Sequence, residues 1–462
     1  MKDRILYGGL GLLLCTQLIS ASANQYTTNT PTSYPANTCT VQPDWFAKDN
    51  SIVPPKPLVI NNTNCDFHQL SWHYFAWLTE KTANGLRFES FTTDIALEGK
   101  TEPANSLPHI FQAGSNGILV DQNGRASYTS MHVNSLFEDF VNTHQLMTAN
   151  GFEQASPTLS FPDGAMELKA SWKIIAPHER DAIEQSGLYV TNKRVKKIIT
   201  NDFGKVALAP NQPSNYQSET VALVGLHIAV WIKDHPEAIW ATFESKLNSP
   251  DLVHGTAINS PISANNYLYY SAQSQKMGDK GLTDNTQKDC NILPAPAVVK
   301  LNASSQTLSP ITQVCRMYQN GGGSSANQNN IRTLNASVHS YPKTPTLLKN
   351  YSEIGAVWFD KDVLAQRLAA EKQPGPMLLN WSPVSTQTDI DPIMAGSNQL
   401  SSSVIETFTQ NNIAENNCFA CHNTASAVGD RNLADIQAKT INLSHILKLN
   451  YLDIKANHGA SK

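Results

Sequence analysis

Two stretches in the middle of the chain constrain the fold most, because their apolar residues recur at every second position. From Met166 to Ile174 the apolar side chains alternate with Glu, Lys and Ser. A second run, TVALVGLHIAVWI at 220–232, is followed by the turn Asp234-His235-Pro236 and then by AIWATFE. A period of two is typical of half-buried strands, and a turn between two such runs predicts a hairpin. We therefore expect an antiparallel sheet across residues 160–250.

The two faces of the longer run differ in character. One face is predicted to be aliphatic, and its members are Val224, Leu226, Ile228, Val230 and Ile232. His227 and Trp231 fall on the opposite face, beside Gly225. Because strand residues alternate between faces, His227 is expected to point away from the aliphatic core.

Helical spacing of apolar residues predicts helices around this sheet. The stretches are 65–80, 132–147, 344–359 and 361–375, and Pro374-Gly375 ends the last of them. Together they predict an α+β fold, with a large front region that contains an antiparallel β-sheet and flanking helices. Two further runs with this spacing, 401–412 and 443–452, lie near the C-terminus, so the tail is predicted to be a small α-helical segment.

Composition suggests how the chain is divided. The expected parts are a signal peptide (1–23), a Pro-rich irregular arm (24–64), an α+β region with long loops (65–330), a helical connector (331–396) and a tail segment (397–462). The stretch NGGGSSANQNN at 320–330 is predicted to be a linker between two of these parts.

The N-terminus has the pattern of a secretory signal. Lys2 and Arg4 precede a short apolar run, and Ala21-Ser22-Ala23 supplies an A-x-A cleavage site, so cleavage is expected after Ala23. The apolar run is short for a bilayer span, and no other stretch approaches 18 apolar residues. No stable membrane span is therefore expected.

Cysteine usage agrees with export. Of the 7 cysteines, Cys15 lies in the signal and two belong to the motif described below, which leaves four. An even remainder in an oxidising compartment suggests two disulfides. Four cysteines allow three connectivities, and the pairing nearest in sequence is Cys39–Cys65 with Cys290–Cys315.

Overall charge gives little support for polyanionic partners. Only 16% of residues are charged and the formal net charge is -4. The chain has no basic stripe of the kind that binds nucleic acid, so no nucleic-acid partner is expected.

The motif that carries chemistry is Cys418-Phe419-Ala420-Cys421-His422, which is C-x-x-C-H. This pattern predicts one covalently attached haem c per chain. In a tight helical turn, Cys418 and Cys421 match the two vinyl groups of the porphyrin, and His422 becomes the proximal axial ligand of the iron. The alternatives are a thioredoxin-like C-x-x-C, half of a zinc site and a third disulfide.

The run leading into CFACH resembles the N-terminal helix of bacterial cytochrome c domains. The longer pattern of MELKASWKII, VGLHIAVWIKDHPEAIWATFE and LLKNYSEIGAVWF before a terminal C-x-x-C-H resembles a group of large, exported, single-haem bacterial proteins known as the cytochrome c family protein group. The resemblance covers most of 160–425. It implies a cytochrome c-like tail at 397–462, a periplasmic location and electron transfer. The group's site residues carry over to Cys418, Cys421 and His422 alone.

The sixth iron ligand is left open by the sequence. Small soluble cytochromes take a Met far downstream of the motif, but no Met follows Met394 here. The candidates are Met394, His445, His227 and His458, or the sixth site is open. A Met ligand raises the reduction potential of a haem, and a second His lowers it.

These features predict a periplasmic electron-transfer protein that exchanges electrons with an unidentified redox partner protein. An open sixth site would instead favour a haem enzyme that acts on peroxide or another small ligand. A third possibility is a binding module, in which the front region recognises a small molecule and the haem relays redox state.

Overall fold

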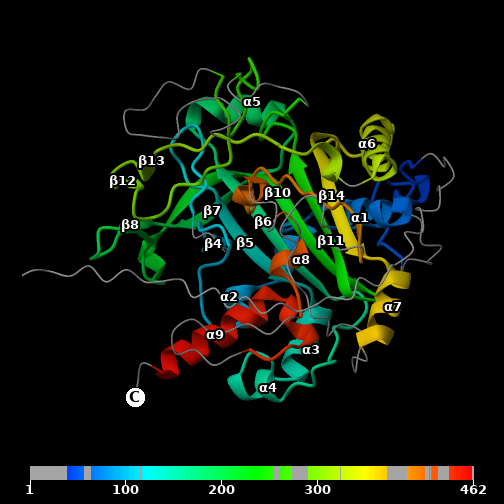
Figure 1. The fold of residues 1–462 in the computed structure, drawn as a ribbon. Coiled ribbons are helices and arrows are strands. Elements are labelled where there is room, and N and C mark those ends of the chain that lie inside the picture. Colours follow the sequence, from blue (N-terminus) through cyan, green and yellow to red (C-terminus); the bar gives the residue numbers. More distant parts are fainter. Residues whose placement is uncertain are drawn as a thin grey trace, which may run out of the picture. The chain divides into compact units, whose positions relative to one another are not determined.

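A large antiparallel sheet organises the fold in the computed structural model (Figure 1). The structure describes residues 39–56, 64–113, 117–253, 260–272, 290–322, 324–371, 393–411, 416, 418–424 and 436–459. The expected signal peptide, its cleavage site and most of the Pro-rich arm before Cys39 lie outside these residues. In the described part of the chain, no helix is both long and apolar enough to cross a bilayer.

The sheet has the order β15-β14-β11-β10-β6-β5-β3, and β7 joins β10 on the same edge as β11. Its strands are β3 (Thr92–Thr93), β4 (Ser106–Leu107), β5 (Tyr128–Val133), β6 (Met166–Ile174), β7 (Val190–Lys196), β10 (Tyr216–Ile232), β11 (His235–Ser245), β14 (Tyr351–Phe359) and β15 (Met394–Gly396). All pairings are antiparallel except β4 with β7. The α+β class and the antiparallel sheet predicted from the sequence are confirmed.

Shorter elements surround this sheet. Three small hairpins are β1 (Lys81–Thr82) with β2 (Gly85–Leu86), β8 (Ile198–Thr200) with β9 (Val206–Leu208), and β12 (Lys300–Asn302) with β13 (Thr307–Ser309). Two short helices are α2 (Asp94–Leu97) and α5 (Arg180–Gln185).

The predicted hairpin between β10 and β11 is confirmed. Ile232 pairs with His235, and Asp234 in the two-residue turn has a φ of 64°. A left-handed residue of this kind suits a tight two-residue turn, and Asp tolerates it better than most residues.

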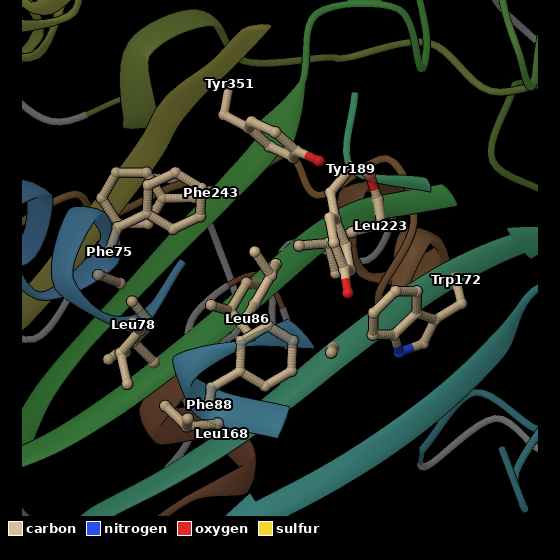
Figure 2. Close-up of a cluster of buried hydrophobic side chains, with 14 of the residues drawn as sticks. Phe75, Leu78, Leu86, Phe88, Leu168, Trp172, Tyr189, Leu223, Phe243 and Tyr351 are labelled. Atoms are coloured by element: carbon tan, nitrogen blue, oxygen red, sulfur yellow. Dashed lines mark hydrogen bonds between the residues drawn. The ribbon is translucent and has the colours of Figure 1, made fainter. Parts of the chain in front are cut away.

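One face of the sheet carries the main hydrophobic core. The α1 helix (Asn64–Leu78) and the α6 helix (Ser325–Ser340) cover this face. Figure 2 shows how Phe75 and Leu78 of α1 lie over the sheet side chains Leu168, Leu223 and Phe243. The rings of Phe75 and Phe243 stack with centroids 4.3 Å apart. Burial of these large apolar groups is what holds α1 to the sheet.

The opposite face carries a second core under the C-terminal part of the chain. The α3 helix (Ser135–Thr143), the α4 helix (Ala149–Gln154) and the α9 helix (His445–Gly459) pack there around Trp231 and Trp240. The expected helices in 132–147 and 443–452 are thus confirmed as α3 and α9. Residues 38–462 form one compact unit, so the described parts of the tail pack against the front region.

The prediction that β6 is half-buried is wrong. Its alternate polar residues Glu167, Ser171 and Lys173 are at most 6% exposed, because the second face is covered as well. Ser171 Oγ donates to the carbonyl of Val404, and Lys173 Nζ lies 2.7 Å from Asp121 Oδ2. The Glu167 carboxyl accepts hydrogen bonds from Ser444 and from the Ile446 amide. The alternation that predicts a solvent face therefore marks a buried polar face.

The connector 331–396 is not simply helical. Residues Tyr351–Phe359, expected as part of a helix, form strand β14 because they pair with β11 and bury both faces. Next to it, α6 begins at Ser325 inside the expected linker and crosses the expected boundary at 330/331. The helix predicted after β14 is confirmed as α7 (Lys361–Glu371).

The helix predicted over 401–412 is absent from the described residues 401–411, where only a 3₁₀ turn, Thr407–Asn411, is present. The buried carboxylate of Glu244 accepts hydrogen bonds from Ser402 Oγ at 2.6 Å and from the Ser403 amide at 2.7 Å. Local bonds to serine side chains and amides compete with helix formation. The resemblance of this run to a cytochrome c helix is therefore not borne out.

Of the two expected disulfides, Cys39–Cys65 is present and pins the arm to the start of α1. Cys290 and Cys315 are buried as thiols and are not joined. Cys315 Sγ lies 3.8 Å from Met317 Sδ, and Asn291 Nδ2 donates to the Cys315 carbonyl.

Candidate haem-binding site

The C-x-x-C-H motif forms a single helical turn, α8 (Cys418–Cys421), on the second face of the sheet. The His422 amide donates to the Cys418 carbonyl at 2.8 Å, and Asn423 Nδ2 donates to the carbonyls of Phe419 and Ala420. Phe419 is fully buried, and its ring lies 4.4 Å from that of Phe359 in β14. This buried ring holds the turn against the sheet.

The two cysteines share one side of this turn but differ in exposure. Cys418 is half-buried and Cys421 is exposed, while Phe419 between them points into the core. Residues three apart in a helical turn share one face. The turn therefore presents both sulfur atoms together, as attachment to the two vinyl groups of one porphyrin requires.

His422 is held with one ring nitrogen committed to the backbone. Its Nδ1 lies 2.8 Å from the carbonyl oxygen of Leu443. Since a carbonyl only accepts, Nδ1 carries the proton and Nε2 carries the lone pair. Burial, with a smaller contribution from His445, lowers the pKa of His422 well below its usual value, so the imidazole is neutral. A neutral imidazole whose other nitrogen is fixed by a carbonyl is the arrangement that metal-ligating histidines use.

Two aromatic rings pack against this imidazole. The Trp240 ring of β11 lies 4.1 Å from it, and the His445 ring stacks on it at 3.7 Å with an interplanar angle of 19°. His445 Nε2 also lies 3.1 Å from the Cys421 carbonyl. Burial lowers the pKa of His445 to about 4, so this imidazole is neutral too.

The stacked position bears on the choice of the sixth ligand. A bound iron would be held by Nε2, at the edge of the His422 ring, whereas His445 lies against the flat face of that ring. In this arrangement His445 is a packing neighbour of His422. Met394, in edge strand β15, pairs with Phe359 of β14, and the Phe359 ring packs on Phe419 of the motif. Met394 therefore lies on the same face of the sheet as the motif, in the strand next to β14. The side chain of His458 lies outside the described residues.

His227 is placed in a polar cluster beside the motif. Its Nε2 is 3.5 Å from Glu406 Oε2, and its Nδ1 is 2.8 Å from Thr242 Oγ1. Lys169 Nζ of β6 also pairs with Glu406. Burial opposes ionisation of Glu406, but Lys169 and His227 outweigh it and hold the pKa of this carboxyl well below its usual range. An ionised carboxylate and two basic groups therefore border the site.

This cluster acts electrostatically on the motif. Burial, then Cys421 and then Glu406, raise the pKa of the Cys418 thiol to about 12. A thioredoxin-like site needs the opposite, a thiolate of lowered pKa. Among the described residues, no group of three or more His, Cys, Asp and Glu side chains is placed to hold a metal ion. The raised pKa of Cys418 counts against the rival thiol-exchange interpretation.

The residues of this site can be compared with the groups that a covalently bound haem c needs. Two thiols on one face of one turn, and an imidazole whose Nε2 lone pair is left open by the Nδ1 bond to Leu443, fit the donor set that such a group needs. Cys418, Cys421 and His422 are brought together as the motif predicts. Lys169, Trp240, Glu406 and Leu443 were not found from the sequence, because each belongs to a separate segment and carries no motif.

Comparison of the chain with known proteins identifies no relative. No protein-family model, no curated protein and no solved structure is significantly similar to the chain. They lend no support to the resemblance to the cytochrome c family protein group, so any functional assignment rests on the site itself.

Proposed function

We propose that this chain is an exported, periplasmic, single-haem c-type protein that transfers electrons to and from a redox partner protein. The observation that carries the proposal is the geometry at His422: its Nδ1 is bound to the Leu443 carbonyl, beside two thiols that share one turn. A haem c supplies one-electron Fe(III)/Fe(II) chemistry when bound. Cys418 and Cys421 would hold it through thioether bonds, and His422 Nε2 would ligate the iron.

The surrounding residues have defined tasks in this proposal. Leu443 orients the imidazole, and Trp240 and His445 prevent its ring from turning. Phe419 anchors the turn to β14 so that the thiols keep their position. The second core around Trp240 provides a low-dielectric wall, which is one of the means by which proteins set a haem potential.

The direct test is haem attachment in a bacterial host that matures c-type cytochromes. We expect the wild-type chain to keep its haem through denaturing electrophoresis and to give the spectrum of a haem c. Cys418→Ser with Cys421→Ser should lose this covalent haem, since no thiol remains in the motif. Cys315→Ser is the matched control, because it removes a thiol outside the motif, and it should retain haem. Covalent haem in the double variant would refute the assignment.

A second candidate function, a haem enzyme that binds a small ligand, is favoured by the polar cluster. Lys169, His227 and Glu406 border the motif with three titratable groups, which an electron carrier does not need. The visible spectrum separates the two functions. Low-spin bands that ignore added cyanide and carbon monoxide support the carrier, whereas high-spin bands that shift with these ligands support the enzyme.

A further inference from the structure

Two small hairpins beside the large sheet form a surface made of residues outside the haem site. β8 with β9 and β12 with β13 lie next to each other (Figure 1). Gln306, in the turn between β12 and β13, accepts a hydrogen bond from the Ile198 amide of β8 at 2.8 Å and donates one to the Ile198 carbonyl at 3.2 Å. The Val206 amide of β9 donates to the Pro296 carbonyl at 3.1 Å. These bonds join the two hairpins and the segment before β12 to one another.

Apolar side chains are exposed on these joined segments. Phe203, at the tip of the β8–β9 hairpin, is 86% exposed, and Val298, in the segment before β12, is 62% exposed. Ile199 of β8 is exposed as well, because its neighbour Ile198 points into the core and strand residues alternate between faces. A single exposed apolar residue needs no explanation, but three on adjoining segments indicate a surface that meets a partner.

The turn that carries Phe203 is ordered by its own hydrogen bonds. Asn201 Oδ1 accepts bonds from the Phe203 amide at 3.0 Å and from the Lys205 amide at 2.9 Å. The Asn201 amide donates to the Lys205 carbonyl at 2.9 Å, and Gly204 has a φ of 71°, which glycine adopts without strain. The backbone of the tip is therefore fixed while the Phe203 ring remains in solvent, so little ordering is left to be lost when the ring enters an apolar phase.

Positive charge accompanies these apolar residues. Residues 194–218 and 291–311, which include both hairpins, contain one acidic residue, Asp202, and five basic ones, namely Arg194, Lys196, Lys197, Lys205 and Lys300. The basic side chains are exposed or half-buried. Glu102, from outside these segments, offsets part of the charge of Lys196. A positive surplus remains, although the whole chain has a formal net charge of -4. The surface therefore suits a partner that is both apolar and anionic.

The shape of the surface favours a lipid partner over a folded protein. Stable protein–protein interfaces bury about 1,200–2,000 Å² in total. Here the most exposed residue, Phe203, stands at the tip of a hairpin whose strands have three residues each. Such a narrow tip offers little area to a folded protein, but it fits between lipid headgroups. Aromatic rings favour the membrane interface, and neighbouring lysines are attracted to anionic headgroups.

We propose that this hairpin surface, which comprises Ile199, Phe203, Val298, Lys205 and Lys300, docks the protein on an anionic phospholipid membrane. The Phe203 ring enters the interfacial layer, and the lysines lie against the headgroup phosphates. Docking of this kind is reversible and differs from a membrane span, because the protein lies on the bilayer and no segment crosses it. The inference does not depend on the haem.

The test is cosedimentation of the full-length exported protein, its processed N-terminus checked by mass spectrometry, with lipid vesicles. One set contains equal parts of phosphatidylglycerol and phosphatidylcholine, and the other contains phosphatidylcholine alone. We expect binding to the anionic vesicles that weakens as salt is added, and little binding to the neutral ones. Phe203→Ala should weaken binding about tenfold, because the ring leaves water only in the bound state. Lys205→Glu with Lys300→Glu should weaken it by at least about tenfold.

Matched control variants change the same kinds of side chain elsewhere. Val253→Ala removes an apolar side chain that is 63% exposed outside the hairpin surface. Lys48→Glu with Lys343→Glu reverses the charge of two exposed lysines outside it, so the net charge changes as in the hairpin variant. Both controls should bind the anionic vesicles like wild type. A thermal melt of each variant shows that it is folded.

Three results would overturn the proposal. The first is no binding of the wild-type protein to the anionic vesicles. The second is binding that the hairpin variants leave unchanged, or that the control variants weaken equally. The third is self-association in analytical ultracentrifugation that Phe203→Ala abolishes, since a second copy of the chain would then be what covers the hairpin surface.

Discussion

The carbonyl oxygen of Leu443 lies 2.8 Å from Nδ1 of His422, so a residue 21 positions beyond the motif sets the tautomer of its histidine. The bond forms because η10 (Thr440–Leu443) and the start of α9 pack over α8 on the second face of the sheet. The closing helix thus completes a site whose ligands lie in another turn. This relationship connects the packing of the tail to the chemistry proposed for it.

Replacing His422 by Ala should leave covalent haem attachment intact but remove the proximal ligand. Because the thioether bonds depend only on Cys418 and Cys421, the haem stain should persist while the low-spin bands disappear from the visible spectrum. Added imidazole should restore these bands by filling the vacated position. Persistence of wild-type bands without imidazole would contradict His422 as the ligand.

His445→Ala is the informative companion variant. Since His445 stacks on the face of His422 and does not lie across from Nε2, its removal should preserve low-spin bands. Met394→Leu serves as the comparison, because Met394 stands on the same face one strand away. A high-spin spectrum from His445→Ala would show that this histidine moves to bind the iron.

The sequence predicts the strands that follow a strict period of two, and it fails where the strand is irregular. The run of β10 was expected to place Val224 on the aliphatic face with Leu226. A β-bulge between Leu223 and Gly225 moves Val224 into a small cluster with Val404 and Ile405 instead. A bulge depends on the partner strand, and the sequence of one strand does not contain it.

The candidate site shows the same division between local and long-range information. C-x-x-C-H is local, so the helical turn and the shared face of its thiols follow from spacing alone. The polar cluster joins Lys169, His227 and Glu406, which are far apart in the chain, through tertiary contacts. Similarly, β14 was predicted to be a helix because its apolar spacing is ambiguous, and pairing with β11 decides its structure.

Glu167 should make the stability of the protein depend on pH. This carboxyl of β6 accepts hydrogen bonds from Ser444 and from the Ile446 amide at the start of α9, yet burial outweighs them and raises its pKa to about 7. A raised pKa means that the folded state favours the protonated form. The protonated Glu167 carboxyl therefore contributes its full stabilisation of the folded state below pH 4.5, the ordinary pKa of a glutamate. This contribution is lost as the pH rises toward 7, and it stays lost above that.

Glu167→Gln tests this directly, because the amide keeps the acceptor oxygen and removes the charge. At pH 8 the free energy of unfolding of the variant should be about 3 kcal/mol higher than that of wild type. The figure follows from the raised pKa of Glu167, since each pKa unit corresponds to about 1.4 kcal/mol. Near pH 4 the two proteins should be equally stable. Urea unfolding across this pH range measures the difference, and a difference independent of pH would contradict the assignment.

Gly225 should tolerate no side chain while Val404 is present. A Cβ at Gly225 would lie 2.6 Å from Val404 Cγ2, where the segment after β15 crosses the sheet. We expect Gly225→Ala to destabilise the protein by about 1–3 kcal/mol through overpacking. The double variant Gly225→Ala with Val404→Ala removes the clash. Its loss in free energy of unfolding should therefore be smaller than the sum of the losses in the two single variants. Additive effects in denaturant melts would contradict the contact.

The Cys39–Cys65 disulfide should stabilise the fold mainly by restricting the unfolded chain. It closes a loop with a sequence separation of 26 residues, and its partner cysteines fix the arm to the first turn of α1. Removing a disulfide that closes a loop of this size lowers the free energy of unfolding by about 3.5 kcal/mol in the chain-entropy model. Cys39→Ser with Cys65→Ser should therefore lower the melting temperature, and a reducing agent should lower that of wild type to the same value. A reducing agent should have no effect on the variant. A further fall in its melting temperature would show that another disulfide contributes.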